Sequence, residues 1–225
     1  MLSACSSSVN EPEIDTSAGI IAFTAEASRA DDSQPAIDAF DVWATRHDPD
    51  GTVELATIFN ATTVSYDNDT KAWTYSGGDR YWLPGLAFNF RALYPAGLSR
   101  VTFNSANGEN SALTVSEIVP TETPSFMAAT DRREISPTTT TQPVVQLTFH
   151  QLLSRISFRG SSNEQQLGVD RRVILEYAAV YGIADRGSWS SEGFKPADGN
   201  LGTWTPSAPT GSSEQPLFKV DYPDG

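Results

Sequence analysis

The residues most often used for acid–base chemistry are scarce in this sequence, and none has an obvious partner. The two histidines are His47, which precedes the turn-forming run Asp48-Pro49-Asp50, and His150, which lies in an apolar stretch. A histidine works as a general base only when it is held within reach of the proton that it removes. No second group has a fixed spacing from either one. We therefore expect His47 in a solvated turn and His150 as a structural hydrogen-bonding residue.

Two acidic runs, Asp48-Pro49-Asp50 and Asp67-Asn68-Asp69, contain the oxygen ligands that Ca²⁺ prefers. A calcium loop also needs a bidentate glutamate at a set distance, which neither run has, so turn formation explains both runs better. The sequence has no glycine-rich phosphate loop, no Cys/His cluster and no Gly-x-Ser-x-Gly elbow. It predicts no catalytic residue, no metal and no cofactor, and an enzyme is the least favoured interpretation.

Three tryptophans, Trp82, Trp189 and Trp204, have aromatic faces on which a sugar ring could stack. Tryptophan more often fills a core or an interface. Trp189 and Trp204 are therefore the candidate site of an alternative function only, that of a glycan-binding surface lipoprotein or adhesin.

The single cysteine, Cys5, ends the run Leu2-Ser3-Ala4-Cys5 and precedes three serines. The run resembles the bacterial lipobox, in which small residues precede a cysteine whose thiol receives a diacylglycerol. The charged and apolar regions that should come before it are absent, which predicts a truncated or misassigned start. No stretch has the length of a membrane helix. Acyl chains on Cys5 would therefore anchor the protein to outer-membrane lipid.

The charge balance argues against one class of partner. Acidic side chains number 28 and basic ones 15, for a formal net charge of −13. Such a charge repels the phosphates of nucleic acids, so no nucleic-acid partner is expected. Hydrophobic residues make up 39% and aromatic residues 10% of the chain, which is enough for a packed core and not typical of a disordered acidic tail.

Apolar alternation predicts strands rather than helices. The clearest strand is 86–94, with apolar side chains on one face and mostly polar ones on the other, as in a half-buried strand. A strand also begins at Ile20, and residues 120–143 are expected to form a long irregular crossing. Between Phe149 and Leu152 the apolar parity changes, which predicts a bulge or helical turn at 150–154. Further strands are predicted at 37–46, 52–59, 62–66, 72–75, 100–103, 111–119, 143–149, 172–182 and 216–222.

These many short strands with regular turn signals predict an all-β fold of the β-sandwich type. Four groups of segments, in this order, also resemble the fimbrillins, the pilin-type subunits of Gram-negative bacteria. The groups are Ile20-Ile21-Ala22-Phe23 with Ser28-Arg29-Ala30; Tyr81–Pro84 with Leu86–Phe90 and Tyr94-Pro95; Met127-Ala128-Ala129 with Val145–Phe158; and Val180–Ile183 with Gly187-Ser188-Trp189 and Trp204. The likeness extends over residues 20–205, and the lipobox agrees with it.

The resemblance implies two tandem β-sandwich domains of the transthyretin or immunoglobulin-like kind. We expect a flexible tether over residues 1–18, an N-terminal domain over 19–158 and a C-terminal β domain over 159–225. Few residues follow Phe158, so the second domain is expected to be short or incomplete. That would suit a fragment, a terminal subunit or a degenerate paralogue.

The resemblance also implies assembly by strand exchange, in which a surface protease cuts after an arginine. Loss of the first strand opens a groove that a strand of the next subunit fills. Here the cut would fall between Arg29 and Ala30 and release residues 19–29, with Ile20, Ile21, Ala22 and Phe23 as the groove strand. Alternatively, Ile20–Ala25 is a permanent strand and Arg29 an ordinary loop residue.

The partners implied are other pilus subunits and a host glycan or protein receptor. The location implied is the outer membrane or cell surface, in a fimbrium.

Overall fold

The computed structural model describes residues 19–28, 37–50, 54–105, 110–138, 143–154, 177–181, 184–207 and 214–219. Their regular structure is β, apart from the short 3₁₀ turn Pro196–Asp198. The predicted all-β class is confirmed. In this part of the chain, no helix is long and apolar enough to cross a membrane. Cys5, Arg29 and Ala30 lie outside the described residues.

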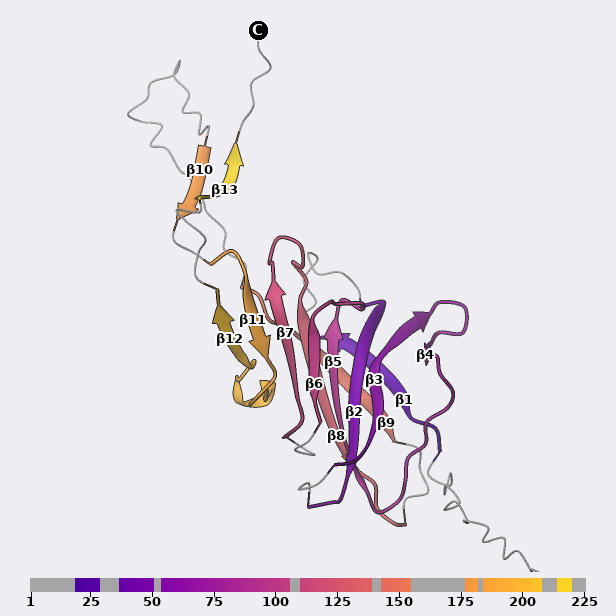
Figure 1. Ribbon diagram of the computed structural model, residues 1–225. Helices are drawn as coiled ribbons and strands as arrows, with labels where there is room; N and C mark the ends of the chain where they lie inside the picture. Colours follow the sequence, from indigo (N-terminus) through magenta and orange to yellow (C-terminus); the bar gives the residue numbers. More distant parts are fainter. Residues whose placement is uncertain are drawn as a thin grey trace, which may run out of the picture.

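The largest sheet has seven strands and curls into a nearly closed, barrel-like layer (Figure 1). Its two edge strands, β1 and β4, come into contact. β1 runs parallel to β9, and every other neighbouring pair is antiparallel. In spatial order the strands are β1 (Ala22–Ala27), β9 (Val144–Gln151), β8 (Met127–Glu134), β5 (Ala87–Tyr94), β2 (Ala39–His47), β3 (Glu54–Asp67) and β4 (Ala72–Tyr75).

A second, four-stranded antiparallel sheet has the order β12-β11-β7-β6. It combines β6 (Val101–Asn104) and β7 (Ala112–Ile118) with β11 (Gly187–Ser190) and β12 (Thr203–Pro206). Its strands thus come from both sides of residue 158, and the domain boundary expected there stays a prediction. A separate antiparallel ribbon pairs β10 (Tyr177–Tyr181) with β13 (Glu214–Lys219).

Two hydrophobic cores hold these layers together. The first core lies inside the curled sheet and is rich in aromatic side chains. The second core lies between the outer face of that sheet and the four-stranded sheet. The first core includes Phe23, Phe40, Phe59, Trp82, Phe88, Phe90 and Phe149. The second includes Trp43, Leu93, Leu113, Phe126, Trp189 and Phe194.

Because a core lies on each face, the central strands are buried on both sides. The prediction that 86–94 is only half-buried is therefore wrong. Leu93 is 0% and Asn89 is 5% exposed, and Asn89 Nδ2 donates to Ser111 Oγ at 3.3 Å. Arg91 lies on the same covered face, and burial lowers the pKa of its guanidinium to about 10.

Residues 120–143 are not wholly irregular, since β8 (Met127–Glu134) lies within them. Its ladder with β5 extends from Met127↔Tyr94 to Glu134↔Ala87. Four of its last five residues are Asp131, Arg132, Arg133 and Glu134, which conceal any apolar alternation. The two strands expected at 52–59 and 62–66 are one strand, β3, which continues through Ala61 at a positive φ of 50°.

Two local expectations near the histidines are also wrong. His47 is fully buried at the end of β2, where its Nδ1 lies 2.8 Å from the carbonyl oxygen of Asp48. The change of apolar parity near residue 150 arises because the side chains on either side of it pack in different cores, and not because of a bulge. Phe149 packs in the first core and Leu152 in the second, on opposite faces of one strand and its extension.

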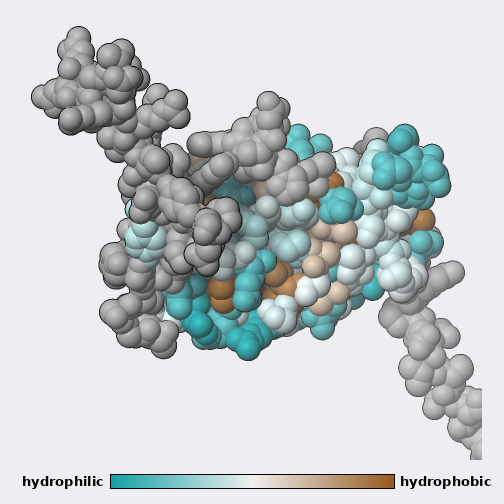
Figure 2. All heavy atoms as spheres, turned by 90° about the horizontal axis from the view of Figure 1, so that it is seen from above, coloured by the Kyte–Doolittle hydropathy of each residue, from teal (hydrophilic) through white to brown (hydrophobic). Residues whose placement is uncertain are grey.

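The surface around these cores has no large continuous hydrophobic patch in the face that Figure 2 draws. In the face drawn in Figure 2, hydrophobic residues form small patches between hydrophilic and intermediate ones. The large hydrophobic residues that are exposed, Ile20, Leu55, Tyr177 and Leu201, lie on separate segments of the described chain. Single exposed residues of this kind are ordinary for a soluble domain surface.

Asp41 joins three segments of the fold and gives a first test of it. Its carboxylate is 6% exposed and accepts hydrogen bonds from the Thr63 hydroxyl and the Gly97 N–H, each at 2.7 Å. Asp41→Ala leaves both donors unsatisfied, so we expect the free energy of unfolding to fall by about 2–3 kcal/mol in urea denaturation. Asp38→Ala, at an exposed aspartate three positions away, should change it by less than about 0.5 kcal/mol.

Candidate functional site

β1 and the groove beneath it form the candidate site. Along this strand the side chains alternate between the first core and solvent. Ile21 and Phe23 are 1% and 4% exposed, whereas Ala22, Thr24 and Glu26 are exposed. Ala25 and Ala27 face inward but are only partly buried. The groove is therefore deep at Ile21 and Phe23 and shallow towards Ala27.

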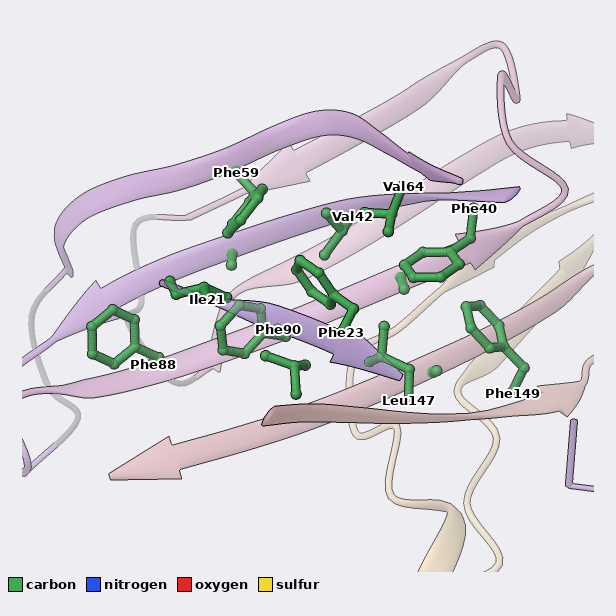
Figure 3. Packing of buried hydrophobic residues seen from close by; sticks show 14 of the residues in the cluster. Ile21, Phe23, Phe40, Val42, Phe59, Val64, Phe88, Phe90, Leu147 and Phe149 are labelled. Atoms are coloured by element: carbon green, nitrogen blue, oxygen red, sulfur yellow. The ribbon is translucent and has the colours of Figure 1, made fainter. Parts of the chain in front are cut away.

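Phe23 fills the centre of the groove (Figure 3). Four aromatic rings surround its ring, all at steep interplanar angles and with centroids 5.4–6.2 Å away. Pairs in this edge-to-face geometry stabilise by about 0.5–1.5 kcal/mol each beyond the burial of apolar area. We call the pocket around Phe23 the β1 groove; its walls are Phe40, Phe59, Tyr75, Phe90 and the neighbouring Leu147.

Backbone and side-chain hydrogen bonds tie β1 to β9. The parallel ladder extends from Ala22↔Val144 to Ala27↔Phe149. Beyond it the Ser28 N–H donates to the Phe149 carbonyl oxygen at 2.8 Å. On the outer face, the Thr148 hydroxyl donates to Glu26 Oε1 at 3.2 Å. Removing β1 would therefore leave the edge of β9 without these partners, which is an open template for another strand.

The start of β1 is held by the segment that follows β4. The Ile21 N–H donates to the Arg80 carbonyl oxygen at 2.8 Å, and the Trp82 N–H donates to the Gly19 carbonyl oxygen at 3.0 Å. The Tyr75 hydroxyl donates to the Ile21 carbonyl oxygen at 3.0 Å. Burial raises the pKa of Tyr75 above its usual value. The hydroxyl therefore stays protonated and able to donate across the physiological pH range.

Arg80 shapes this end of the groove independently of β1. Its guanidinium lies 4.5 Å from the centroid of the Phe59 ring and 5.5 Å from that of Tyr75. Its Nε donates to the Ile58 carbonyl oxygen at 2.6 Å. These contacts involve only groove residues and their neighbours, so they would support the walls with or without the strand.

The sequence did not indicate Tyr75 or Arg80 as functional residues. Tyr75 lies in a predicted strand, but nothing in the sequence shows that this strand meets β1 at the closing seam of the sheet. Arg80 lies in a loop without periodicity. Their roles depend on contacts between distant segments, for which a single sequence gives no signal.

The three tryptophans have structural positions. Trp82 is fully buried, and its Nε1 donates to the Pro143 carbonyl oxygen at 2.9 Å. Trp189 is 1% exposed, and its Nε1 donates to the Leu201 carbonyl oxygen at 2.8 Å. Trp204 is partly buried and donates to the Leu152 carbonyl oxygen at 3.1 Å. Neither face of Trp189 is available to a sugar in this structure, so sugar stacking stays a prediction that depends on Trp204.

The predicted histidines do not come together with other catalytic groups. His150 lies on β9 with its ring centroid 6.4 Å from that of Phe194, and burial lowers its pKa. Among the residues that the structure describes, no three His, Cys, Asp or Glu side chains are grouped as a metal site would require. The geometry supports strand binding, in which backbone edges and apolar pockets act together.

Comparison with known proteins gives one match. The model of a family described as Fimbrillin-like matches residues 28–215, most of the chain, beginning one residue after the end of β1. Searches among curated proteins and among solved structures find no match. Because this match extends over far more than half of the sequence, the chain belongs to the Fimbrillin-like family.

Proposed function

We propose that this protein is a structural subunit of a cell-surface fimbria, or an accessory to one, and that it assembles when a strand of another subunit replaces β1. Membership of the Fimbrillin-like family implies a fimbria-related surface protein that assembles with other pilus subunits, and the family is typically non-enzymatic. The observation that carries the finer proposal is β1 itself. It is an edge strand, yet its Phe23 occupies the centre of the main aromatic core.

The position of the proposed cut fits this architecture. β1 ends at Ala27, and Ser28 makes the last described contact of the segment. A cut between Arg29 and Ala30 would release the whole of β1 and its lead-in residues while leaving every other strand intact. Asp31 and Asp32 would then keep the new terminus in solvent.

The energetics favour replacement over an empty groove. Without β1, several aromatic side chains would face water, and full burial of each such side chain is worth about 1.5–3 kcal/mol. The edge of β9 would also lack its ladder partner. A strand from a second subunit would bury these aromatic side chains again and would pair with the edge of β9. Removal of β1 would therefore drive association and not simply permit it.

The lipid anchor is part of the same proposal. An acylated Cys5 lies on the N-terminal side of the proposed cut. Cleavage would separate the lipid from the body of the protein, and the lipid would have served for transport to the outer membrane. Without cleavage, the anchor would be permanent and the subunit would stay at the base of the fibre or apart from it.

We also retain two tandem β-sandwich domains as a proposal. The ribbon of β10 and β13 supports it, because it pairs residues 177–181 with residues 214–219, apart from both larger sheets.

Limited digestion of the purified full-length protein with an arginine-specific protease tests the proposed function. We expect a new N-terminus at Ala30 and, in unheated SDS gels, a ladder of oligomers that collapses to monomer on boiling. The undigested protein should remain monomeric under the same conditions. A protein that is fully cut after Arg29 and still runs as a monomer at high concentration would argue against strand exchange.

A further inference from the structure

A hollow of about 350 Å³ lies away from the first core, on the outer face of the curled sheet. Its floor is formed by β8 and β9, and its wall is the segment 194–198 between β11 and β12. The volume is within the range usual for small-molecule sites, about 300–1,000 Å³. We call it the outer hollow; its polar lining includes Gln146, His150, Lys195 and Asp198.

The outer hollow exists because β8 and β9 separate. They pair only at Met127↔Gln151 and Ala128↔His150. Beyond that point the Gln146 N–H donates to the Asp131 carboxylate at 2.9 Å instead of to a strand. Asp131 is in turn held by Arg133 at 2.8 Å. The Asp131 side chain therefore stabilises the point at which β8 and β9 separate. Beyond this point β8 does not cover the outward-facing side chains of β9.

Hydrogen bonds and core packing hold the wall of the outer hollow in place. Lys195 and Asn200 exchange two backbone hydrogen bonds, of 2.9 and 3.1 Å. Phe194 is 5% exposed and anchors the segment in the second core. Trp189 holds the far end of the segment through its bond to Leu201. A ligand would therefore meet a preformed surface and would pay little to order it.

The hydroxyls of Thr130 and Thr148 in the lining already donate to Phe90 and Glu26, whereas four other polar side chains have no such partner. The side chains of Gln146, His150, Lys195 and Asp198 line the hollow and make no hydrogen bond or ion pair with another residue that the structure describes. Burial lowers the pKa of His150, so its imidazole is neutral at neutral pH and offers one donor and one acceptor. The charges of Lys195 and Asp198 cancel.

We propose that the outer hollow binds a neutral, hydroxyl-rich saccharide. Such a ligand needs donors and acceptors in near balance, which an amide, a neutral imidazole, an ammonium and a carboxylate supply. The balanced charge gives no preference for a phosphate or another anion. Pro196 and Ala197, which also line the hollow, offer a small apolar surface for the C–H face of a sugar ring. This proposal is independent of strand exchange, because the site is formed with β1 in place.

The surroundings favour an oligosaccharide over a single sugar. A second hollow, of about 250 Å³, lies alongside on the same face, and Gln146 and Thr148 line both. Its other side is formed by the β1 residues Thr24, Ala25 and Glu26. The two hollows share Gln146 and Thr148 and together make an elongated track, which suits a chain of two or more sugar units.

The test uses the intact, uncut protein on a printed array of defined neutral, sialylated and sulfated oligosaccharides. The best neutral ligand is then titrated calorimetrically into variants. We expect Gln146→Ala and Asp198→Ala each to weaken binding by at least about tenfold, because each removes hydrogen bonds to the sugar. Ala197→Trp, which fills the hollow from an exposed position, should abolish binding. The control Glu192→Ala, exposed on the same connection but outside the lining, should leave binding unchanged.

Each changed side chain is exposed, so thermal unfolding should confirm that the variants fold as the parent does. Binding to no member of the array would overturn the proposal, as would binding confined to sialylated or sulfated glycans. Neutral glycan binding that survives Ala197→Trp but is lost in Trp204→Ala would also overturn it and would favour the tryptophan site. None of these outcomes depends on cleavage at Arg29.

Discussion

Phe23→Ala is expected to lower the free energy of unfolding of the uncut protein by about 3–5 kcal/mol, the usual cost of deleting a buried phenylalanine ring. Phe23 is 4% exposed and touches four other aromatic rings. The loss is a large share of the stability of an ordinary domain, about 5–15 kcal/mol. Urea denaturation of parent and variant measures it, and the exposed neighbour substitution Ala22→Ser should stay within about 0.5 kcal/mol.

The same substitution separates strand exchange from a merely structural role for β1. After cleavage Phe23 leaves with the released segment, so oligomers formed from Phe23→Ala protein should be as stable towards SDS and heat as those of the parent. Phe59→Ala, in the wall of the groove, should weaken both the uncut protein and the oligomers, because Phe59 remains in the assembled subunit. Oligomers that lose stability in Phe23→Ala would contradict the exchange of β1.

Features that depend on local alternation were predicted well. The sequence places apolar residues at every second position of 86–94, and the structure has β5 (Ala87–Tyr94) there. The start of β1 was predicted from Ile20–Phe23 for the same reason. In both cases the pattern that buries one face of a strand is complete within a few residues, so no information about distant segments is needed.

Features that depend on distant partners were not predictable in this way. Phe88 and Phe90 indicate one buried face, but only the four-stranded sheet shows that the face with Leu93 is covered too. The sequence does not predict β8, because its backbone ladder with β5 leaves no pattern in the side chains. The four charged residues at its end are more typical of a loop. The sequence predicts His47 in a turn because the adjacent Asp-Pro-Asp run dominates the local signal.

The same distinction between local patterns and distant partners applies to the candidate site. The strand that would leave was identified by residue, whereas the groove that it occupies comes from β2, β3, β4, β5 and β9, whose arrangement no local pattern gives. The outer hollow was not foreseen at all. It arises from the separation of β8 and β9 and from a loop more than forty residues away in sequence, held by Lys195 and Asn200.

Arg29→Ala is expected to abolish assembly while leaving the fold intact. Arg29 is the second residue after the end of β1, and an arginine-specific protease cannot cut at alanine. β1 would then stay in its groove, where its ladder with β9 blocks the edge that an incoming strand needs. The protein isolated from cells should lack the terminus at Ala30, keep an acylated Cys5 and form no SDS-resistant oligomers. N-terminal sequencing and unheated gels of membrane and released fractions measure all three.

Arg29→Lys is the matched control, because it keeps the charge and length of the side chain and removes only recognition by an arginine-specific protease. It should behave as Arg29→Ala does, and a lysine-specific protease added outside the cell should restore the new terminus and the oligomers. That rescue would show that loss of β1, and not the identity of residue 29, limits assembly. If Arg29→Ala protein assembles as the parent does, with its only terminus at Cys5, then β1 is a permanent strand and the subunit remains lipid-anchored.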